Sequence, residues 1–112
     1  LVINIDGAGF RGYNDALSFY GTSPAAEETA KKVLEEFPTL MLGESWPQSD
    51  HMVFAMNQVP AMAITTQGFA QMEKQVAHTA KDNLDVVDAA LFVEAAAFIQ
   101  KLIFSLDKDG IC

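Results

Sequence analysis

The chain has 112 residues, half of them hydrophobic, which is enough to build one domain with a substantial core. The formal net charge of −8 excludes non-specific nucleic-acid binding, because that activity needs a basic surface. The single cysteine, Cys112, excludes an internal disulfide and a cysteine-cluster zinc site. We expect no signal peptide in the chain and no apolar segment that approaches a membrane span, so we predict no membrane partner.

The chain opens directly on an apolar stretch. Residues 1–5 (LVINI) predict a buried strand, which ends at Asp6-Gly7-Ala8-Gly9, where glycine allows a sharp turn or a close approach to a ligand. Because there is no initiator methionine, we expect the chain to be an excised or processed part of a longer protein. Residues 10–22 mix glycine, asparagine, aspartate and aromatic residues and are interpreted as a long ordered loop.

A helix is predicted to begin at Ser23-Pro24, since serine is a good capping residue and proline suits the first helical position. Its apolar face recurs at helical spacing as far as Phe37, and Pro38 ends it. Residues 39–42 then predict a short strand, and residues 43–48 a loop that carries Trp46.

Residues 49–66 are the segment around which we interpret the second half of the chain. Ser49-Asp50-His51 is a helix start, and we expect either Ser49 or Asp50 to cap that helix. The apolar run 59–64 lacks polar alternation, which is typical of a strand covered on both faces. A short helix over 69–77 and a polar loop over 78–83 follow. Asp85 or Asp88 is expected to cap a last helix that ends near Leu106 and buries a wide face (Leu91, Phe92, Ala95, Phe98, Ile99, Leu102 and Ile103).

Three polar residues have both a functional and a structural interpretation. Asp6 follows a strand at the edge where α/β sheets place ligand sites, but its carboxylate could equally accept hydrogen bonds from the following turn. His51 could instead point into the core or a loop. His78 stands on a loop, where a lone histidine is more often structural than catalytic. Asp6 and His78 could nevertheless supply half of the ligands in a zinc coordination sphere. Spacing alone supports that pairing weakly, because any aspartate and histidine could be paired.

The motifs are more specific when they are taken together. In order they are Asn4-Ile5-Asp6-Gly7, Ser49-Asp50-His51-x-x-Phe54, Val59-Pro60-Ala61 and His78-Thr79-x-x-Asp82-Asn83. This set resembles the zinc aminopeptidases of peptidase family M28, across essentially the whole chain. The resemblance implies an α/β fold, a three-layer αβα sandwich with a mostly parallel sheet. Residues 1–112 would be a single domain, the C-terminal portion of that catalytic fold.

The resemblance also implies roles for individual residues. Asp6 would be a ligand of one zinc ion and His78 a ligand of the other. Ser49, Asp50 and His51 would support these ligands or lie on the substrate side. An upstream histidine, a bridging aspartate and a Glu-Glu pair that includes the general base would precede Leu1. The pairs Glu27-Glu28 and Glu35-Glu36 do not match that motif. The chain would therefore carry two metal ligands and no catalytic base.

We therefore predict that the longer protein is a co-catalytic zinc aminopeptidase with two zinc ions that removes N-terminal residues from peptides. The chain alone would be inactive and hold no stoichiometric zinc. The partners would be a peptide N-terminus and a second copy bound through an exposed sheet edge or helix face. Two alternatives stay open: a non-catalytic binding or dimerisation module of the same fold, and a glutaminyl cyclase-like acyl transferase. Compartment and residue preference are not predicted.

Overall fold

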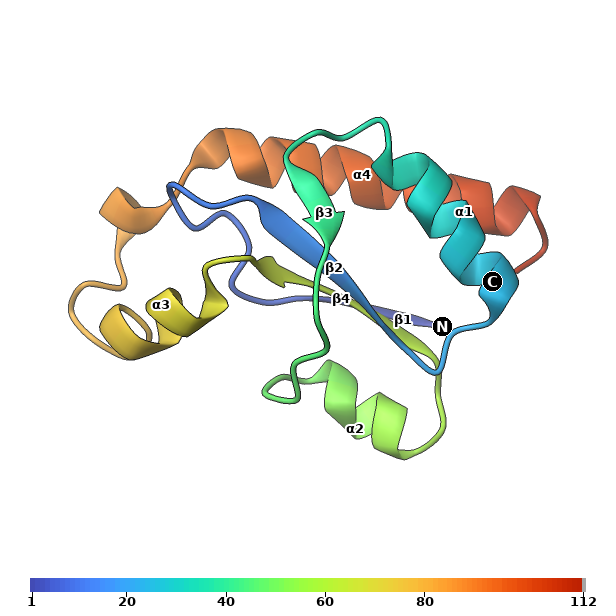
Figure 1. The fold of residues 1–112 in the computed structure, drawn as a ribbon, viewed down its shortest axis with the longest axis horizontal. Coiled ribbons are helices and arrows are strands. Elements are labelled where there is room, and N and C mark those ends of the chain that lie inside the picture. The colour runs from blue at the N-terminus through green and yellow to red at the C-terminus, as the bar shows by residue number, and fades with distance from the viewer. Residues whose placement is uncertain (112) are drawn as a thin grey trace.

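The computed structural model describes residues 1–111, in which a four-stranded sheet carries helices on both faces (Figure 1). The strands are β1 (Val2–Ile5), β2 (Asp15–Tyr20), β3 (Leu40–Leu42) and β4 (Ala61–Thr66), and the helices are α1 (Pro24–Leu34), α2 (His51–Met56), α3 (Phe69–Gln75) and α4 (Ala89–Lys108), with a 3-10 turn η1 (Leu84–Val86). Helices α1 and α4 lie on one side of the sheet, α2 and α3 on the other. The predicted αβα arrangement is confirmed.

The sheet has the order β1-β4-β2-β3. Strand β1 runs parallel to β4 and β2 runs parallel to β3, whereas β2 and β4 are antiparallel. The sheet is therefore mostly parallel, as predicted. All six residues of β4 are buried, which confirms the fully covered strand expected from its unbroken apolar run.

The first strand forms as predicted but is less buried than expected. It pairs only with β4, in a register that places Val2 opposite Ala61 and Ile5 opposite Ile64. Its other edge is free in the described part of the chain, so Leu1 and Ile5 remain 42% and 51% exposed. An apolar sequence alone could not show that this strand lies at an edge.

The interpretation of residues 10–22 as a loop is wrong for Asp15–Tyr20, which form β2 in the interior of the sheet. Leu17 belongs to the main core and Phe19 packs against it. Ser18 lies on the alternate face and donates to the Ala63 carbonyl. The strand pairs with β4 over its full length, because hydrogen bonds to two neighbours outweigh the turn-forming composition of the flanking residues.

The core lies between the sheet and the two helices α1 and α4. Ala26, Ala30 and Val33 of α1 are buried there, and the predicted Ser23 cap is confirmed, since its side chain accepts from the Ala26 N–H. Asp88 caps α4 in the same way. The buried stripe of α4 is narrower than predicted: Leu91, Ala95, Phe98, Leu102 and Leu106 are buried, but Phe92 and Ile103 are 44% and 46% exposed.

Helix α4 also corrects the expectation that no segment approaches a membrane span. By length and composition alone this 20-residue helix could cross a membrane. A helix that lines the core of a globular protein passes the same test, because it needs a long apolar face. Phe98, Leu102 and Leu106 of α4 are fully buried against the sheet, and this accounts for only part of the apolar composition of the helix, because Val93 and Phe104 are 70% and 67% exposed.

Candidate metal centre

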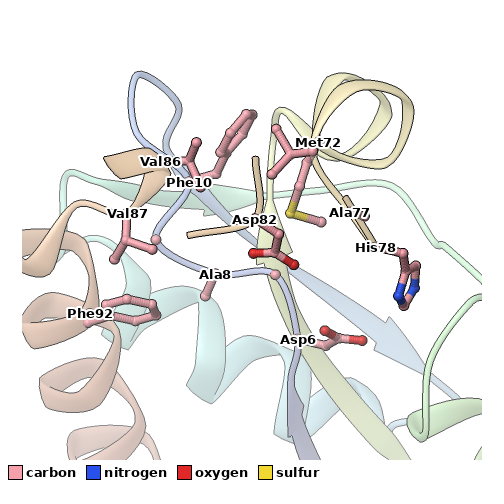
Figure 2. Close-up of a pocket in the computed structure, with 13 residues that line it drawn as sticks. Asp6, Ala8, Phe10, Met72, Ala77, His78, Asp82, Val86, Val87 and Phe92 are labelled. Atoms are coloured by element: carbon pink, nitrogen blue, oxygen red, sulfur yellow. The ribbon is translucent and has the colours of Figure 1, made fainter. Parts of the chain in front are cut away.

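Asp6, His78 and Asp82 line one cavity of about 310 Å³, although up to 76 residues separate them (Figure 2). Asp6 directly follows β1, and the parallel pairing with β4 places it beside the end of that strand. The chain leaves β4 through α3, which delivers His78 to the same edge of the sheet. The cavity walls are mostly apolar and include Met72 and Phe92.

The turn after Asp6 is fixed by contacts with the start of β2 and the start of α4. The Gly9 N–H donates to Asp15 Oδ1 at 2.9 Å, and the Gly9 carbonyl accepts from the Asp88 N–H at 2.9 Å. Gly9 has φ +81°, and a Cβ built on it would lie 2.8 Å from the Phe92 ring. Only glycine fits this turn without strain, so the glycine pattern after Asp6 serves to hold the backbone close to the start of α4.

His78 adopts a left-handed backbone conformation with φ +58°, which is uncommon for a residue with a side chain. The following Thr79 steadies this turn, because its hydroxyl donates to the Val76 carbonyl at 2.6 Å. The imidazole itself is exposed and lies on the side of the cavity where Asp6 is found (Figure 2). Residues held in sparsely populated backbone regions often mark functional sites, and His78 fits that pattern.

Ser49 does not cap α2, and neither does Asp50, so the expected cap is wrong. Asp50 occupies the capping position, but its side chain makes no capping hydrogen bond. The Ser49 hydroxyl instead donates to Asp6 Oδ2 at 2.7 Å and accepts from Asn4 Nδ2 at 2.9 Å. Bonding to a carboxylate outweighs capping here, because a charge-assisted hydrogen bond is stronger than one to a neutral backbone group.

His51 is buried at the start of α2 and does not line the cavity that Asp6 and His78 share. Its ring is fully buried between Tyr20 and Trp46, with centroid distances of 4.4 and 4.7 Å. Nε2 lies 2.8 Å from the Trp46 carbonyl oxygen, and Nδ1 lies 3.2 Å from Asn4 Nδ2. Its contacts are therefore with Tyr20, Trp46 and Asn4, which lies two positions before Asp6.

Comparison with known protein families shows to which family the chain belongs. A family model described as peptidase family M28 matches residues 1–103. The chain belongs to peptidase family M28. At the level of the family this membership implies a hydrolase of the metallopeptidase type, and M28 members generally depend on zinc. No curated protein and no solved structure matches the chain.

Asp6 and His78 of this M28 chain offer the types of donor atom that zinc prefers, but they are fewer than a zinc site requires. Carboxylate oxygen and imidazole nitrogen are both common zinc ligands, and a catalytic zinc takes about three protein ligands plus water. Within residues 1–111, however, no group of three His, Cys, Asp or Glu side chains is placed to hold a metal ion. Asp6 and His78 are therefore donors of the kind that zinc takes, but two donors are fewer than a zinc site needs.

Two residues near the site were not singled out as functional from the sequence. Asp82 shares the cavity with Asp6 and His78, and the only sequence signal for it is its place in the His-Thr-x-x-Asp motif. Asn4 joins Ser49 to His51 through its side chain. Strand periodicity could have placed Asn4 on the face of α2, but it could not have shown that two distant side chains meet there.

Proposed function

We propose that this M28 chain is the C-terminal part of the catalytic domain of a co-catalytic zinc aminopeptidase that removes N-terminal residues from peptides. The observation that carries the proposal is the shared cavity, which holds the Asp6 carboxylate and the His78 imidazole at the end of β1 and β4. Both side chains are exposed and therefore accessible to a metal ion and a substrate.

In this proposal the residues at the cavity have distinct roles. Asp6 holds one zinc ion and His78 holds the other, as the M28 pattern implies. Ser49 keeps the Asp6 carboxylate in place through its 2.7 Å hydrogen bond. Two bound zinc ions would polarise the scissile carbonyl and lower the pKa of a bound water. The apolar walls formed by Met72, Val76 and Phe92 would contact an apolar part of the peptide.

The general base and the remaining donors would come from residues outside the 112. Among residues 1–111, no glutamate lines the cavity that Asp6 and His78 share. Glu28 pairs with Lys32 and Glu36 pairs with Lys101, so the two Glu-Glu pairs take part in surface ion pairs. The presence of both Asp6 and His78 at one cavity argues against one alternative, a non-catalytic module of the same fold.

The decisive experiment uses the full-length protein that contains this chain. We expect two equivalents of zinc and hydrolysis of an aminoacyl anilide, with a loss of at least about a hundredfold in kcat/KM for Asp6→Ala and for His78→Ala. Asp107→Ala is the matched control, because Asp107 is exposed near the end of α4 and does not line the cavity. Cyclisation of an N-terminal glutamine peptide without anilide hydrolysis would establish the acyl transferase instead. A zinc-free, inactive protein would establish the module.

A further inference from the structure

The hydrogen bonds behind Asp6 form one continuous series that runs from the cavity to the buried residues His51 and Trp46. Ser49 Oγ lies 2.7 Å from Asp6 Oδ2, and Asn4 Nδ2 lies 2.9 Å from Ser49 Oγ. The same Asn4 nitrogen lies 3.2 Å from His51 Nδ1, and His51 Nε2 lies 2.8 Å from the Trp46 carbonyl oxygen. Five residues from three segments therefore share one series of contacts.

The chemistry of the end groups fixes the direction of every hydrogen bond. The Trp46 carbonyl can only accept, so His51 Nε2 must carry a proton and donate. In the neutral ring Nδ1 is then an acceptor, and the Asn4 amide must donate to it. The amide has a second N–H for Ser49 Oγ, and the only hydroxyl proton of Ser49 is left for Asp6. Every donor in the series meets an acceptor.

The inner end of the series is anchored rigidly. The His51 ring is fully buried between Tyr20 and Trp46. The Tyr20 hydroxyl accepts from the Trp46 N–H at 2.8 Å and donates to the Trp46 carbonyl at 3.0 Å. The main chain of Trp46 is thus held on both sides, and the carbonyl that receives His51 Nε2–H cannot move away from the ring without breaking these bonds.

We propose that Asn4 and His51 are positioning residues that act through Ser49 on the Asp6 carboxylate. The buried His51 fixes the Asn4 amide as a double donor, and Asn4 in turn directs the Ser49 hydroxyl proton toward Asp6. Asp6 is exposed, so without this series its side chain would sample several rotamers. The inference rests on the proposed role of Asp6 as a metal ligand, but the hydrogen-bond series can be tested without any metal.

The first test reads the ring protons of the histidines by ¹⁵N NMR. The 112-residue chain has two histidines, so in this chain His78→Gln leaves His51 as the only source of histidine signals. We expect His51 with protonated Nε2 and unprotonated Nδ1. In Asn4→Asp an acceptor replaces the donor, so Nδ1 should shift to the position of a protonated nitrogen. A wild-type His51 protonated at Nδ1 and not at Nε2 would overturn the proposal, because the direction of the series would be reversed.

The second test follows the Asp6 carboxyl carbon by ¹³C NMR in water and in heavy water. The Ser49 hydroxyl proton should give this carbon an isotope shift in the wild type. The shift should be lost in Ser49→Ala, reduced in Asn4→Ala and restored in Ser49→Thr, which keeps the hydroxyl. Ser45→Ala is the matched control, since Ser45 is exposed on the same loop. An unchanged isotope shift in Asn4→Ala would overturn the positioning role of Asn4.

A Co²⁺ titration of the full-length protein and of its Ser49→Ala variant separates this inference from the proposed function. We expect broadening of Asp6 and His78 signals, with an affinity about tenfold weaker in Ser49→Ala, as is typical when a residue that orients a metal ligand is lost. Equal affinity of the wild type and Ser49→Ala would overturn the positioning role alone. A wild type with the expected isotope shift but no Co²⁺ effect would overturn the metal-site proposal and leave the hydrogen-bond series established.

Discussion

Asp15 Oδ1 accepts a hydrogen bond of 2.9 Å from the Gly9 N–H and so ties the turn after Asp6 to the first residue of β2. Asp15 is fully buried, and its second carboxylate oxygen has no hydrogen-bond partner among the described residues. A buried carboxylate with one free oxygen costs free energy when it ionises, because the charge loses its hydration. The turn that carries Asp6 therefore depends on a group whose charge is unfavourable in its surroundings.

This arrangement predicts a specific dependence of stability on pH. Burial raises the pKa of Asp15 above its ordinary value of 3.8, and the smaller effect of the Gly9 N–H lowers it. The stability that a raised pKa contributes is complete below the unfolded value and is lost as the pH rises through the folded value. Between about pH 4 and pH 7, the free energy of unfolding should therefore decline more in the wild type than in Asp15→Asn. Urea denaturation of both proteins checks this, and parallel pH profiles would contradict it.

The two turn glycines Gly9 and Gly12 make a matched pair for separating strain from crowding. Both have a left-handed backbone, with φ +81° and +89°, but a Cβ on Gly9 would meet Phe92 at 2.8 Å, whereas a Cβ on Gly12 would meet nothing within 4 Å. We expect Gly12→Ala to destabilise by about 1 kcal/mol, the cost of the left-handed conformation. Gly9→Ala should cost about 1–3 kcal/mol more, because the site is also overpacked. Thermal denaturation measures both, and equal losses would show that the Phe92 ring moves aside freely.

Metal content of the 112-residue chain is a further prediction. Two donors are too few for a stable zinc site, which needs three or four. The chain alone should therefore hold no stoichiometric zinc and hydrolyse no aminoacyl substrate. Isothermal titration calorimetry and elemental analysis test this directly. Tight, one-to-one zinc binding by the isolated chain would mean that donors other than Asp6 and His78 complete the site.

The free edge of β1 leads us to expect that the chain self-associates. Leu1 and Ile5 are exposed beside backbone groups that pair with no strand of the described sheet, and such an edge invites pairing with another chain. An apolar groove between Leu1, Ile3 and the α4 residues Ile103 and Leu106 continues the surface. We expect a two-fold dimer that buries this edge. Light scattering across a dilution series should show it, and a monomer at high micromolar concentration would contradict it. Ile5→Lys should abolish the dimer, because a charge on the edge blocks strand pairing.

The parts of the fold that could be predicted are those with a strong local signal. Ser23-Pro24 marked the start of α1, and the uninterrupted apolar run after Val59 marked β4. The missed strand, β2, begins with a buried aspartate and follows several glycines, so its flanks resemble a turn. Apolar and polar residues do alternate in β2, since Leu17 faces the core and Ser18 the opposite face. However, six residues give too weak a strand signal to outweigh the turn-like composition of the flanking residues.

The candidate site could be predicted only as a set of residue types. The motifs placed Asp6 and His78 in one site, and the structure brings both to the same cavity. The role of Ser49 could not be inferred from its sequence neighbours, because a serine before a helix normally caps that helix. Here Ser49 instead donates a hydrogen bond to Asp6, 43 residues away. The burial of His51 has the same cause: contacts with Tyr20 and Trp46 exist only once the sheet has formed.

The position of β1 also determines when the site can form during folding. Val2 pairs with Ala61, so the first strand cannot join the sheet until more than half of the chain is present. Parallel pairings between distant segments form slowly, because the loop between them must close before any contact offsets its entropy. The sheet can begin from β2, α1 and β3, which are neighbours in sequence. Asp6 and Ser49 should then meet only in the last steps of folding, and mutations that slow the docking of β1 should delay the site more than the core.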